Sequence, residues 1–393
     1  MRTSTALGPL VLAAALALAG CGAAGTAGAQ QSHAASKRGA VEAPYPGSSV
    51  AGFQAVDLTW VSDQQGWALG TAPGCAGQRC ATILETTDGG VQWTTVADLH
   101  DCLLEAAPVG CPAGVPQVSQ IRFANADDGY AFASDGGPYS VTENGGLSWQ
   151  VASGREASVI KVGFGTAIRI SFSHGGCPGP CDWSIDRATV AQNSWQTLYT
   201  PPSSFNHGRV VLLRQGPEDI YAAFLGAEPA KSVAQLVVST NGGATWQNRG
   251  DPCTADETGF VSTDFAAAPN GVLVALCAAS SFQKSAVAIS TDSGAEFGPL
   301  ESMPPPSSGS YSEIAATSAE SIFAAVPSRE LVESQTGGRQ WRVAIKVKQR
   351  PSAATPQTTF LGFEDPLVGR WVGPPDTLWS TTNGGLTWTA RSF

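Results

Sequence analysis

Thr86–Trp93 reads TTDGGVQW, and this octet returns five more times along the 393-residue chain. The other copies are TENGGLSW (Thr142–Trp149), STNGGATW (Ser239–Trp246), STDSGAEF (Ser290–Phe297), SQTGGRQW (Ser334–Trp341) and TTNGGLTW (Thr381–Trp388). Each copy has Ser or Thr first, Asp or Asn third, Gly fifth and an aromatic residue eighth, except that Thr336 replaces the acid or amide in one copy. The recurrence indicates a chain built from repeated units.

The recurring positions predict the tip of a β-hairpin. An Asp or Asn side chain accepts a hydrogen bond from the backbone N–H two residues on, and Gly adopts a positive φ without steric cost. The flanking stretches favour strands, so we expect the aromatic residue to lie on the outgoing strand and to fill the gap between neighbouring sheets. The structural residues of this kind are Asp88, Gly90, Trp93, Asn144, Gly146, Trp149, Asn241, Gly243, Trp246, Asp292, Gly294, Phe297, Gly338, Trp341, Asn383, Gly385 and Trp388.

The spacing of the octets predicts the fold. Successive closing aromatics are 56, 97, 51, 44 and 47 residues apart, and the long step contains ATVAQNSW (Ala188–Trp195), which keeps only the aromatic residue. With Trp195 counted, seven units follow one another at about 49 residues each. Repeats of ~40–50 residues with four short strands each are typical of a β-propeller. We therefore expect an all-β, seven-bladed propeller.

The octet resembles the Asp-box, or BNR, repeat of sialidases, sortilin-type receptors and several glycoside hydrolases. Upstream of the octets lies a second element, a strand, a polar turn, Gly and another strand, as in LTWVSDQQGWALG (Leu58–Gly70) and IRFANADDGYAFA (Ile121–Ala133). This pairing is similar to the photosystem II assembly-factor-like branch of Asp-box propellers, over roughly Gly52 to Phe393. The resemblance implies a helper role in assembling membrane protein complexes. It does not imply photosynthesis here.

The topology predicts two different faces. If the strands of a blade are called A to D from the axis outward, antiparallel order puts the A–B turns and the octets on one face. The B–C and D–A connections then share the opposite face. We expect the ring to close in phase, without a blade shared between the two ends of the chain. The alternative is that part of 39–50 adds an outer strand to blade seven.

The first fifty residues read as a targeting signal and a tether. Arg2 precedes an apolar run from Leu7 to Leu18, and small residues stand directly before Cys21. This pattern resembles a bacterial lipoprotein signal over 1–20, with Cys21 lipidated, and an ordinary secretory signal is the alternative. Residues 21–50 are rich in Ala, Gly, Ser and Gln and predict a flexible linker. The propeller would then occupy 51–393, anchored to the cell membrane on its extracytoplasmic side.

The cysteines are consistent with export. Eight remain after Cys21, and in an oxidising compartment an even number favours disulfides. We expect local pairing, with a swap between the first two pairs as the main alternative, and we expect all four pairs on the face opposite the octets. The expected pairs are Cys75–Cys80, Cys102–Cys111, Cys177–Cys181 and Cys253–Cys277.

Composition and charge limit the partners. The formal net charge is −10, which does not favour nucleic acid, because phosphates need Lys and Arg for neutralisation. It also argues against broad adhesion to anionic lipid, so we expect membrane contact through the lipid anchor only. We expect a monomer without a cofactor.

No catalytic set is evident. Sialidases need an arginine triad, and Arg122, Arg169, Arg214 and Arg370 only recur near inner strands. A glycosidase needs two carboxyl groups ~5–9.5 Å apart, and the acids left for that role are Asp101, Glu105, Asp182 and Asp251 on the loop face. The segment from His174 to Cys181 has too few ligands for a zinc site, so we expect no metal.

The functional prediction is therefore a surface-anchored, non-catalytic propeller that binds or scaffolds envelope proteins or glycans. The alternative is a glycan-active hydrolase that uses the loop face. Long loops on a rigid scaffold commonly carry recognition, and the candidate binding residues there are His174, Asp182 and Trp183. Trp183 has a second interpretation, as a buried residue at the start of strand C of blade three.

Overall fold

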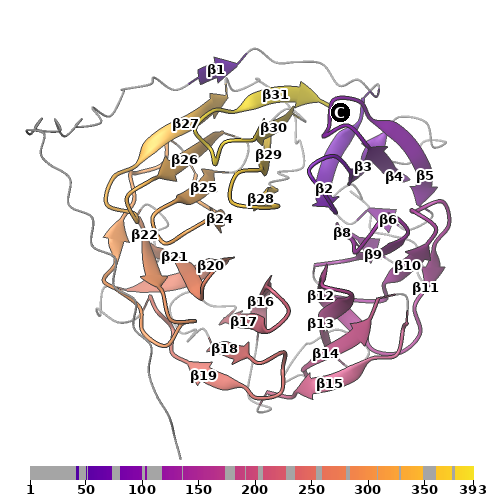
Figure 1. Cartoon of the computed structure of the whole chain (residues 1–393), viewed down its shortest axis with the longest axis horizontal. Coiled ribbons are helices and arrows are strands. Elements are labelled where there is room, and N and C mark those ends of the chain that lie inside the picture. Colours follow the sequence, from indigo (N-terminus) through magenta and orange to yellow (C-terminus); the bar gives the residue numbers. More distant parts are fainter. Residues whose placement is uncertain are drawn as a thin grey trace, which may run out of the picture. The chain divides into compact units, whose positions relative to one another are not determined.

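The computed structural model places seven β-sheets around a ring (Figure 1). The chain divides into Met1–Arg38 and Gly39–Phe393, and the ring belongs to the second unit. The structure describes residues 41–43, 50, 52–72, 80–99, 102–103, 117–134, 136–172, 182–190, 192–201, 207–226, 235–253, 259–279, 284–307, 309–326, 329–347, 360–373 and 377–393. These residues form strands and turns without any helix, and none therefore supplies a helix that could cross a membrane.

Each blade is an antiparallel sheet whose strands follow chain order from the axis outward. Blade one consists of β2 (Gln54–Trp60), β3 (Gly66–Ala72), β4 (Cys80–Thr86) and β5 (Thr94–Leu99). Blade two consists of β8 (Gln120–Phe123), β9 (Asp128–Phe132), β10 (Ser140–Glu143) and β11 (Gln150–Val151). Blade three consists of β12 (Glu156–Gly163), β13 (Thr166–Phe172), β14 (Ser184–Thr189) and β15 (Gln196–Tyr199). The next two are β16 (His207–Gln215), β17 (Asp219–Gly226), β18 (Gln235–Thr240) and β19 (Gln247–Arg249); and β20 (Phe260–Ala268), β21 (Val272–Ala279), β22 (Ser285–Ser290) and β23 (Glu301–Ser302). The last two are β24 (Glu313–Ala316), β25 (Ile322–Val326), β26 (Glu330–Ser334) and β27 (Arg342–Val347); and β28 (Leu361–Phe363), β29 (Gly369–Gly373), β30 (Thr377–Thr381) and β31 (Thr389–Ser392). The predicted seven-bladed propeller is confirmed.

The ring closes in phase, since blades one and seven each take all four strands from one continuous part of the chain. The Val50 N–H donates to the Phe393 carbonyl at 2.9 Å, which ties the two ends of the ring together. An outer strand is added by β1 (Val41–Ala43), but it pairs in parallel with β27 of blade six and not with blade seven. A short parallel pair, β6 (Cys102–Leu103) with β7 (Gln117–Val118), lies between blades one and two in the chain.

The octets form one repeated hydrogen-bond pattern. In the first copy the Thr86 hydroxyl accepts the Gly90 N–H at 3.0 Å and donates to Asp88 Oδ1 at 2.9 Å. Asp88 Oδ1 in turn accepts the N–H of Gln92 at 2.9 Å. Equivalent bonds to the fifth-position Gly occur in the other five copies, at 2.8 to 3.0 Å. The first residue of the octet, for which the sequence suggested no role, therefore stabilises the turn through hydrogen bonds of its buried hydroxyl.

Two details of the predicted turn were wrong. The acid or amide accepts from the N–H four residues on, rather than two, because the turn is longer than a simple Asx turn. The closing aromatic stands just before the outgoing strand and not on it, so the outer strand of blade one begins at Thr94 rather than near Val91. Gly385 shows why the fifth position needs glycine: its φ is +87°, and a Cβ there would lie 2.3 Å from the Phe323 ring of blade six.

A second set of bonds places the octets and the A–B turns on one face, as predicted. In blade one the Gly89 N–H donates to the Gln64 carbonyl at 2.8 Å. Blades two and seven repeat this bond between Gly145 and Asp127 and between Gly384 and Leu367, each at 2.8 Å. We call this side of the ring the octet face, and the side of the B–C and D–A connections the loop face.

The closing aromatics fill the spaces between blades, as expected. Trp93 packs in a cluster with Leu378 and Val372 of blade seven, and Trp246 lies 5.3 Å from the Tyr199 ring of blade three. Nearer the axis, Trp67 of blade one stacks on Phe123 of blade two with ring centroids 4.0 Å apart. The core is thus a chain of apolar clusters between successive blades.

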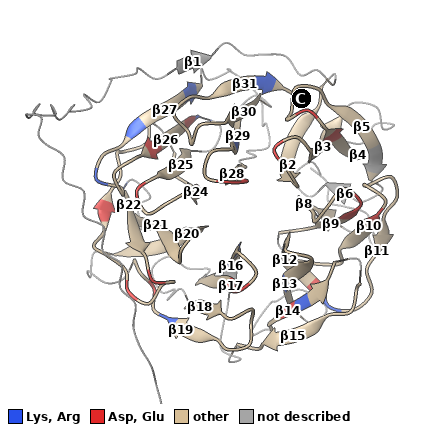
Figure 2. Ribbon diagram, viewed as in Figure 1, with Lys and Arg blue, Asp and Glu red and all other residues tan. Residues whose placement is uncertain are grey.

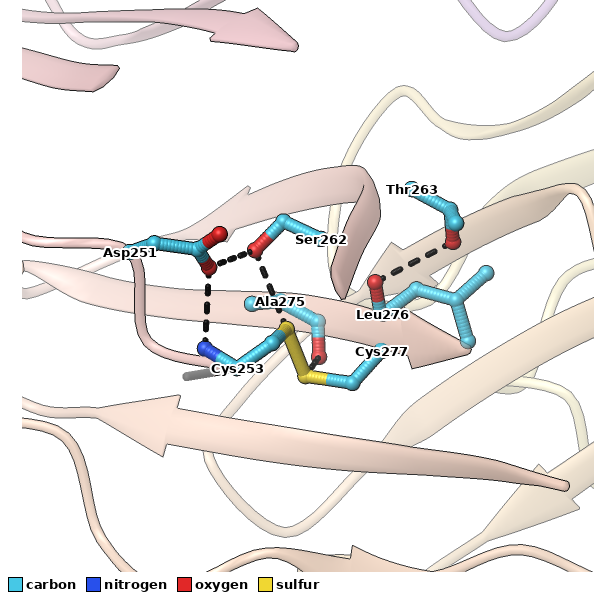
Figure 3. Close-up of a disulfide and its surroundings, with 7 residues drawn as sticks. All are labelled: Asp251, Cys253, Ser262, Thr263, Ala275, Leu276 and Cys277. Carbon is cyan, nitrogen blue, oxygen red and sulfur yellow. Dashed lines mark hydrogen bonds between the residues drawn. A yellow bond between two sulfur atoms is a disulfide. The ribbon is translucent and has the colours of Figure 1, made fainter. Parts of the chain in front are cut away.

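The Cys253–Cys277 disulfide is present, with its sulfur atoms 2.01 Å apart (Figure 3). It joins the segment after β19 to β21, on the loop-face side of blades four and five. Asp251 braces it, because its carboxylate accepts the Cys253 N–H at 2.9 Å and the hydroxyl of Ser262. The other three expected pairs stay predictions, because each includes at least one cysteine outside the described residues: Cys75, Cys111, Cys177 and Cys181. Cys21 and the expected signal also lie outside them.

The buried hydroxyl of an octet should contribute more to stability than the exposed one. We expect Thr381→Val to lower the free energy of unfolding by about 1–3 kcal/mol, because it leaves the Gly385 N–H unpaired at nearly constant shape. Thr387→Val in the same octet removes only an exposed hydroxyl and should change stability by less than ~0.5 kcal/mol. Urea unfolding of both variants tests this, and equal effects would contradict the role given to Thr381.

Candidate functional site

A central cavity of about 270 Å³ lies where the seven innermost strands converge. Every blade contributes a lining residue: Asp57, Gln120, Lys161, Arg209, Asp264, Glu313 and Phe360. Gln120, Glu313 and Phe360 stand at or just before the start of the innermost strands of blades two, six and seven, which is the loop-face end. The cavity is polar, with acidic and basic side chains in the same lining.

Two of the carboxylates are held by ion pairs that cross blade boundaries. Asp57 of blade one pairs with Arg122 of blade two, and its Oδ2 also accepts the Ile121 N–H at 2.8 Å. Asp264 of blade five pairs with Arg209 of blade four at 3.3 Å and accepts the Ile314 N–H of blade six at 3.2 Å. Both carboxylates therefore connect innermost strands of neighbouring blades. The backbone hydrogen bonds of the sheets cannot make this connection, because they run only between strands of the same blade.

Lys161 is the exception among these charges. Its side chain is partly buried in the lining, and within the described part of the chain its amine makes no hydrogen bond or ion pair. Removal from water and the nearby Arg122 lower the pKa of Lys161 from 10.5 to about 8, while Asp57 and Asp264 oppose the shift. The cavity therefore offers one available cationic donor in a site of reduced hydration.

Asp264 is a buried acid of the same lining. Burial raises the pKa of the Asp264 carboxyl, whereas Arg209, two backbone N–H groups and Lys161 lower it. Glu313 lines the same cavity from the next blade. These two are the only acids of adjacent blades that share the cavity among the residues described.

The recurring arginines do not converge on one site. Arg169 is buried, donates to Asp186 at 3.0 Å and lies over the Trp195 ring, 4.1 Å from its centroid. Arg214 donates to the carbonyls of Gly163 and Thr166, and Arg370 donates to the Asp63 carbonyl at 2.9 Å. Only Arg122 reaches the cavity, so the arrangement needed for a sialidase is absent from these four.

The predictions made from the sequence for residues of the loop face have different outcomes. The prediction that Trp183 contacts a ligand is wrong, because its side chain is 6% exposed. Trp183 packs between Phe172 and Phe224 and so fills the space between blades three and four. Asp182 is exposed, and its backbone carbonyl accepts a bond from Arg155. Asp251 is buried, and its carboxylate accepts the Cys253 N–H and the Ser262 hydroxyl, an arrangement that serves the disulfide segment. His174, Asp101 and Glu105 lie outside the described residues.

Sequence reasoning missed the cavity residues. Asp57, Lys161 and Asp264 stand on innermost strands, and no motif marks them. The one available signal was a charged residue within an otherwise apolar strand, as in AVDLTW (Ala55–Trp60) and FVSTDFAAA (Phe260–Ala268).

In the described residues no three His, Cys, Asp or Glu side chains gather as a metal site would require. Charged residues are spread over many blades rather than gathered in one basic patch (Figure 2).

The comparisons with known proteins identify a shared fold. No family model matches the chain, and no curated protein matches its sequence. Among solved structures, YCF48 bound to D1 peptide is similar with a TM-score of 0.56 and 18% identity, over 84% of this chain and 92% of that one. YCF48 from Cyanidioschyzon merolae gives a TM-score of 0.51 and 14% identity over 86% and 95%. A prolyl endopeptidase gives 0.54 and 11% over 86% of this chain and 50% of that one. At these identities the likeness establishes the fold alone.

Lys161 should make stability depend on alkaline pH. Because its pKa is lower in the folded chain, the unfolded chain binds more protons between about pH 8 and 10.5, so folding becomes more favourable as pH rises through that window. We expect Lys161→Met to be more stable than the wild type below pH 8, by an amount on the order of 1–2 kcal/mol, and the difference to vanish near pH 10.5. Urea unfolding of both proteins across this range is the measurement. A constant difference would show that Lys161 titrates normally.

Proposed function

We propose that this chain is a non-catalytic binding propeller that holds a polypeptide segment of another envelope protein at its central cavity. The observation that carries the proposal is the lining of that cavity. All seven blades contribute to it, two of its three carboxylates, Asp57 and Asp264, are already paired with arginines, and the Lys161 amine is available.

The chemistry of the lining favours a partner that presents a carboxylate. A buried amine is stabilised by an opposite charge, and an acidic side chain or a chain terminus would supply one. Gln120 and the half-exposed Arg209 offer further polar contacts in the same lining. A cavity of about 270 Å³ lies at the lower end of ligand pockets, which suits one or two side chains better than a long ligand.

The similarity to YCF48 bound to D1 peptide supports a protein ligand in general. The D1 peptide is what YCF48 binds in that structure. For this chain we take the partner to be an envelope protein, because the N-terminal sequence resembles a lipoprotein signal. The lipoprotein-like signal before Cys21 and the Asp-box resemblance belong to the same proposal: a monomer anchored by lipid on the extracytoplasmic side of the cell membrane, with a helper or scaffold role.

A glycan hydrolase is the second candidate, favoured by Asp264 and Glu313. A glycosidase needs one carboxyl group with a raised pKa, and burial raises that of Asp264. The Arg209 ion pair and the Ile314 N–H oppose this role, since both stabilise the ionised carboxylate. We therefore rank binding first.

A photo-crosslinker in the cavity should identify the partner. We expect p-benzoylphenylalanine in place of Phe360, an aromatic lining residue, to trap one specific envelope protein in cells, as read by mass spectrometry of the crosslinked band. Adding Lys161→Met should reduce the yield about tenfold or more, because the partner's carboxylate loses its counter-ion. Lys161→Arg should retain most of it.

The matched control is the same crosslinker at Val151, which is exposed on the outer strand β11. Identical products from both positions would mean that the cavity has no specific partner. An unchanged yield in Lys161→Met would remove the carboxylate from the proposal while leaving protein binding in place.

The same preparation separates binding from hydrolysis. We expect the purified protein to leave a panel of polysaccharides intact at pH 5–8, with no difference between wild type and Asp264→Asn in a reducing-sugar assay. Hydrolysis by the wild type that Asp264→Asn abolishes would reverse the ranking in favour of the hydrolase.

A further inference from the structure

The exposed large apolar side chains of the described residues gather on the octet face. Apart from Val151, all of them lie at turn tips on that side: Val91, Leu147, Phe164, Leu367 and Leu386, each 53–68% exposed. Val91, Leu147 and Leu386 occupy the sixth octet position of blades one, two and seven. Phe164 and Leu367 are in the A–B turns of blades three and seven. The five residues thus follow one continuous arc over blades seven, one, two and three, which we call the apolar arc.

Phe164 is the most unusual member of the arc. It stands in a two-residue hairpin turn between the paired residues Gly163 and Thr166, and its φ is +52°. This turn type requires positive φ at both central positions and favours Asn–Gly, so a bulky aromatic residue is strained there. Arg214 fixes the turn through the carbonyls of Gly163 and Thr166, with its guanidinium 5.2 Å from the Phe164 ring centroid. A strained, exposed and well-supported aromatic side chain points to contact with another molecule.

In blades four, five and six the described turn tips of the octet face carry no exposed large apolar side chain. The sixth octet position is Ala244 in blade four, Ala295 in blade five and Arg339 in blade six. Among the described residues, exposed large apolar side chains at turn tips are therefore confined to four of the seven blades. Single exposed apolar residues are ordinary, but five on consecutive blades of one face favour an interaction surface.

The charges between the apolar tips indicate the chemistry of the partner. The turns of blades seven, one and two carry Asp63, Asp127, Glu143 and Asp365 as exposed acids. The A–B turns and octets of these three blades contain no Lys or Arg. A second copy of this face would set acid against acid, and anionic lipid would be repelled. A complementary surface carries apolar side chains flanked by Lys or Arg.

We propose that the apolar arc docks a basic, amphipathic polypeptide surface, at a site separate from the central cavity. The apolar tips would insert between the partner's apolar side chains, and the surrounding acids would meet its Lys and Arg. None of the five residues lines the cavity, so this proposal is independent of the carboxylate site at Lys161.

A designed peptide tests the chemistry directly. The probe is a short labelled helical peptide with Leu on one face and Lys on the other, titrated against the full chain by fluorescence anisotropy. We expect Leu147→Ser combined with Leu386→Ser to weaken binding about tenfold or more. Val151→Ser, which removes an equally exposed apolar residue from an outer strand, should leave it unchanged. A matched Leu/Glu peptide should not bind.

Phe164→Asn provides a second and sharper test. Asn suits the turn better, so the variant should keep or raise the melting temperature while binding the Leu/Lys peptide several-fold more weakly. A loss of binding without loss of stability identifies a docking residue. Equal binding by the wild type and all arc variants, or equal binding of the Leu/Glu peptide, would overturn the proposal.

Discussion

The architecture depends on one small interaction, the bond from the fifth-position Gly N–H of each octet to the hydroxyl of its first residue. That hydroxyl also donates to the acid or amide at the third position, which in turn accepts from the backbone beyond the glycines. Buried polar groups are costly when unpaired, so the three bonds form or fail together. The bond from the N–H of the fourth octet residue, such as Gly89, to the A–B turn then fixes the hairpin against the inner part of its own blade.

This constraint gives the two sides of the ring different roles. On the octet face the backbone is occupied by turn bonds, and variation is left to the exposed sixth position and the A–B tips. There the chain places large apolar residues over blades seven to three and small or basic ones elsewhere. On the loop face, the disulfide Cys253–Cys277 with Asp251 strengthens the connection after blade four.

The central cavity is produced by the ring as a whole. Each innermost strand contributes one or a few side chains, and the ion pairs of Asp57 and Asp264 join strands that share no ladder hydrogen bonds. Burial of charge in such a place is tolerated where partners are close, which is so for both carboxylates and both arginines. Among the described residues Lys161 has no such partner, and its lowered pKa reflects the cost of holding a charged amine there.

The sequence by itself determined the number of blades, the octet turns and the assignment of turns to faces, because these follow from a repeat whose hydrogen bonds are local. It also identified Cys253 and Cys277 as a pair. Tertiary structure alone decided that Trp183 is buried, that β1 joins blade six, and that Asp57, Lys161 and Asp264 meet at the axis. These residues are separated by about one hundred positions or more in the chain, and only closure of the ring brings them together. The exposure and strain of Phe164 were hidden for the same kind of reason, since an aromatic residue between two glycines reads equally well as core until the hairpin around it is seen.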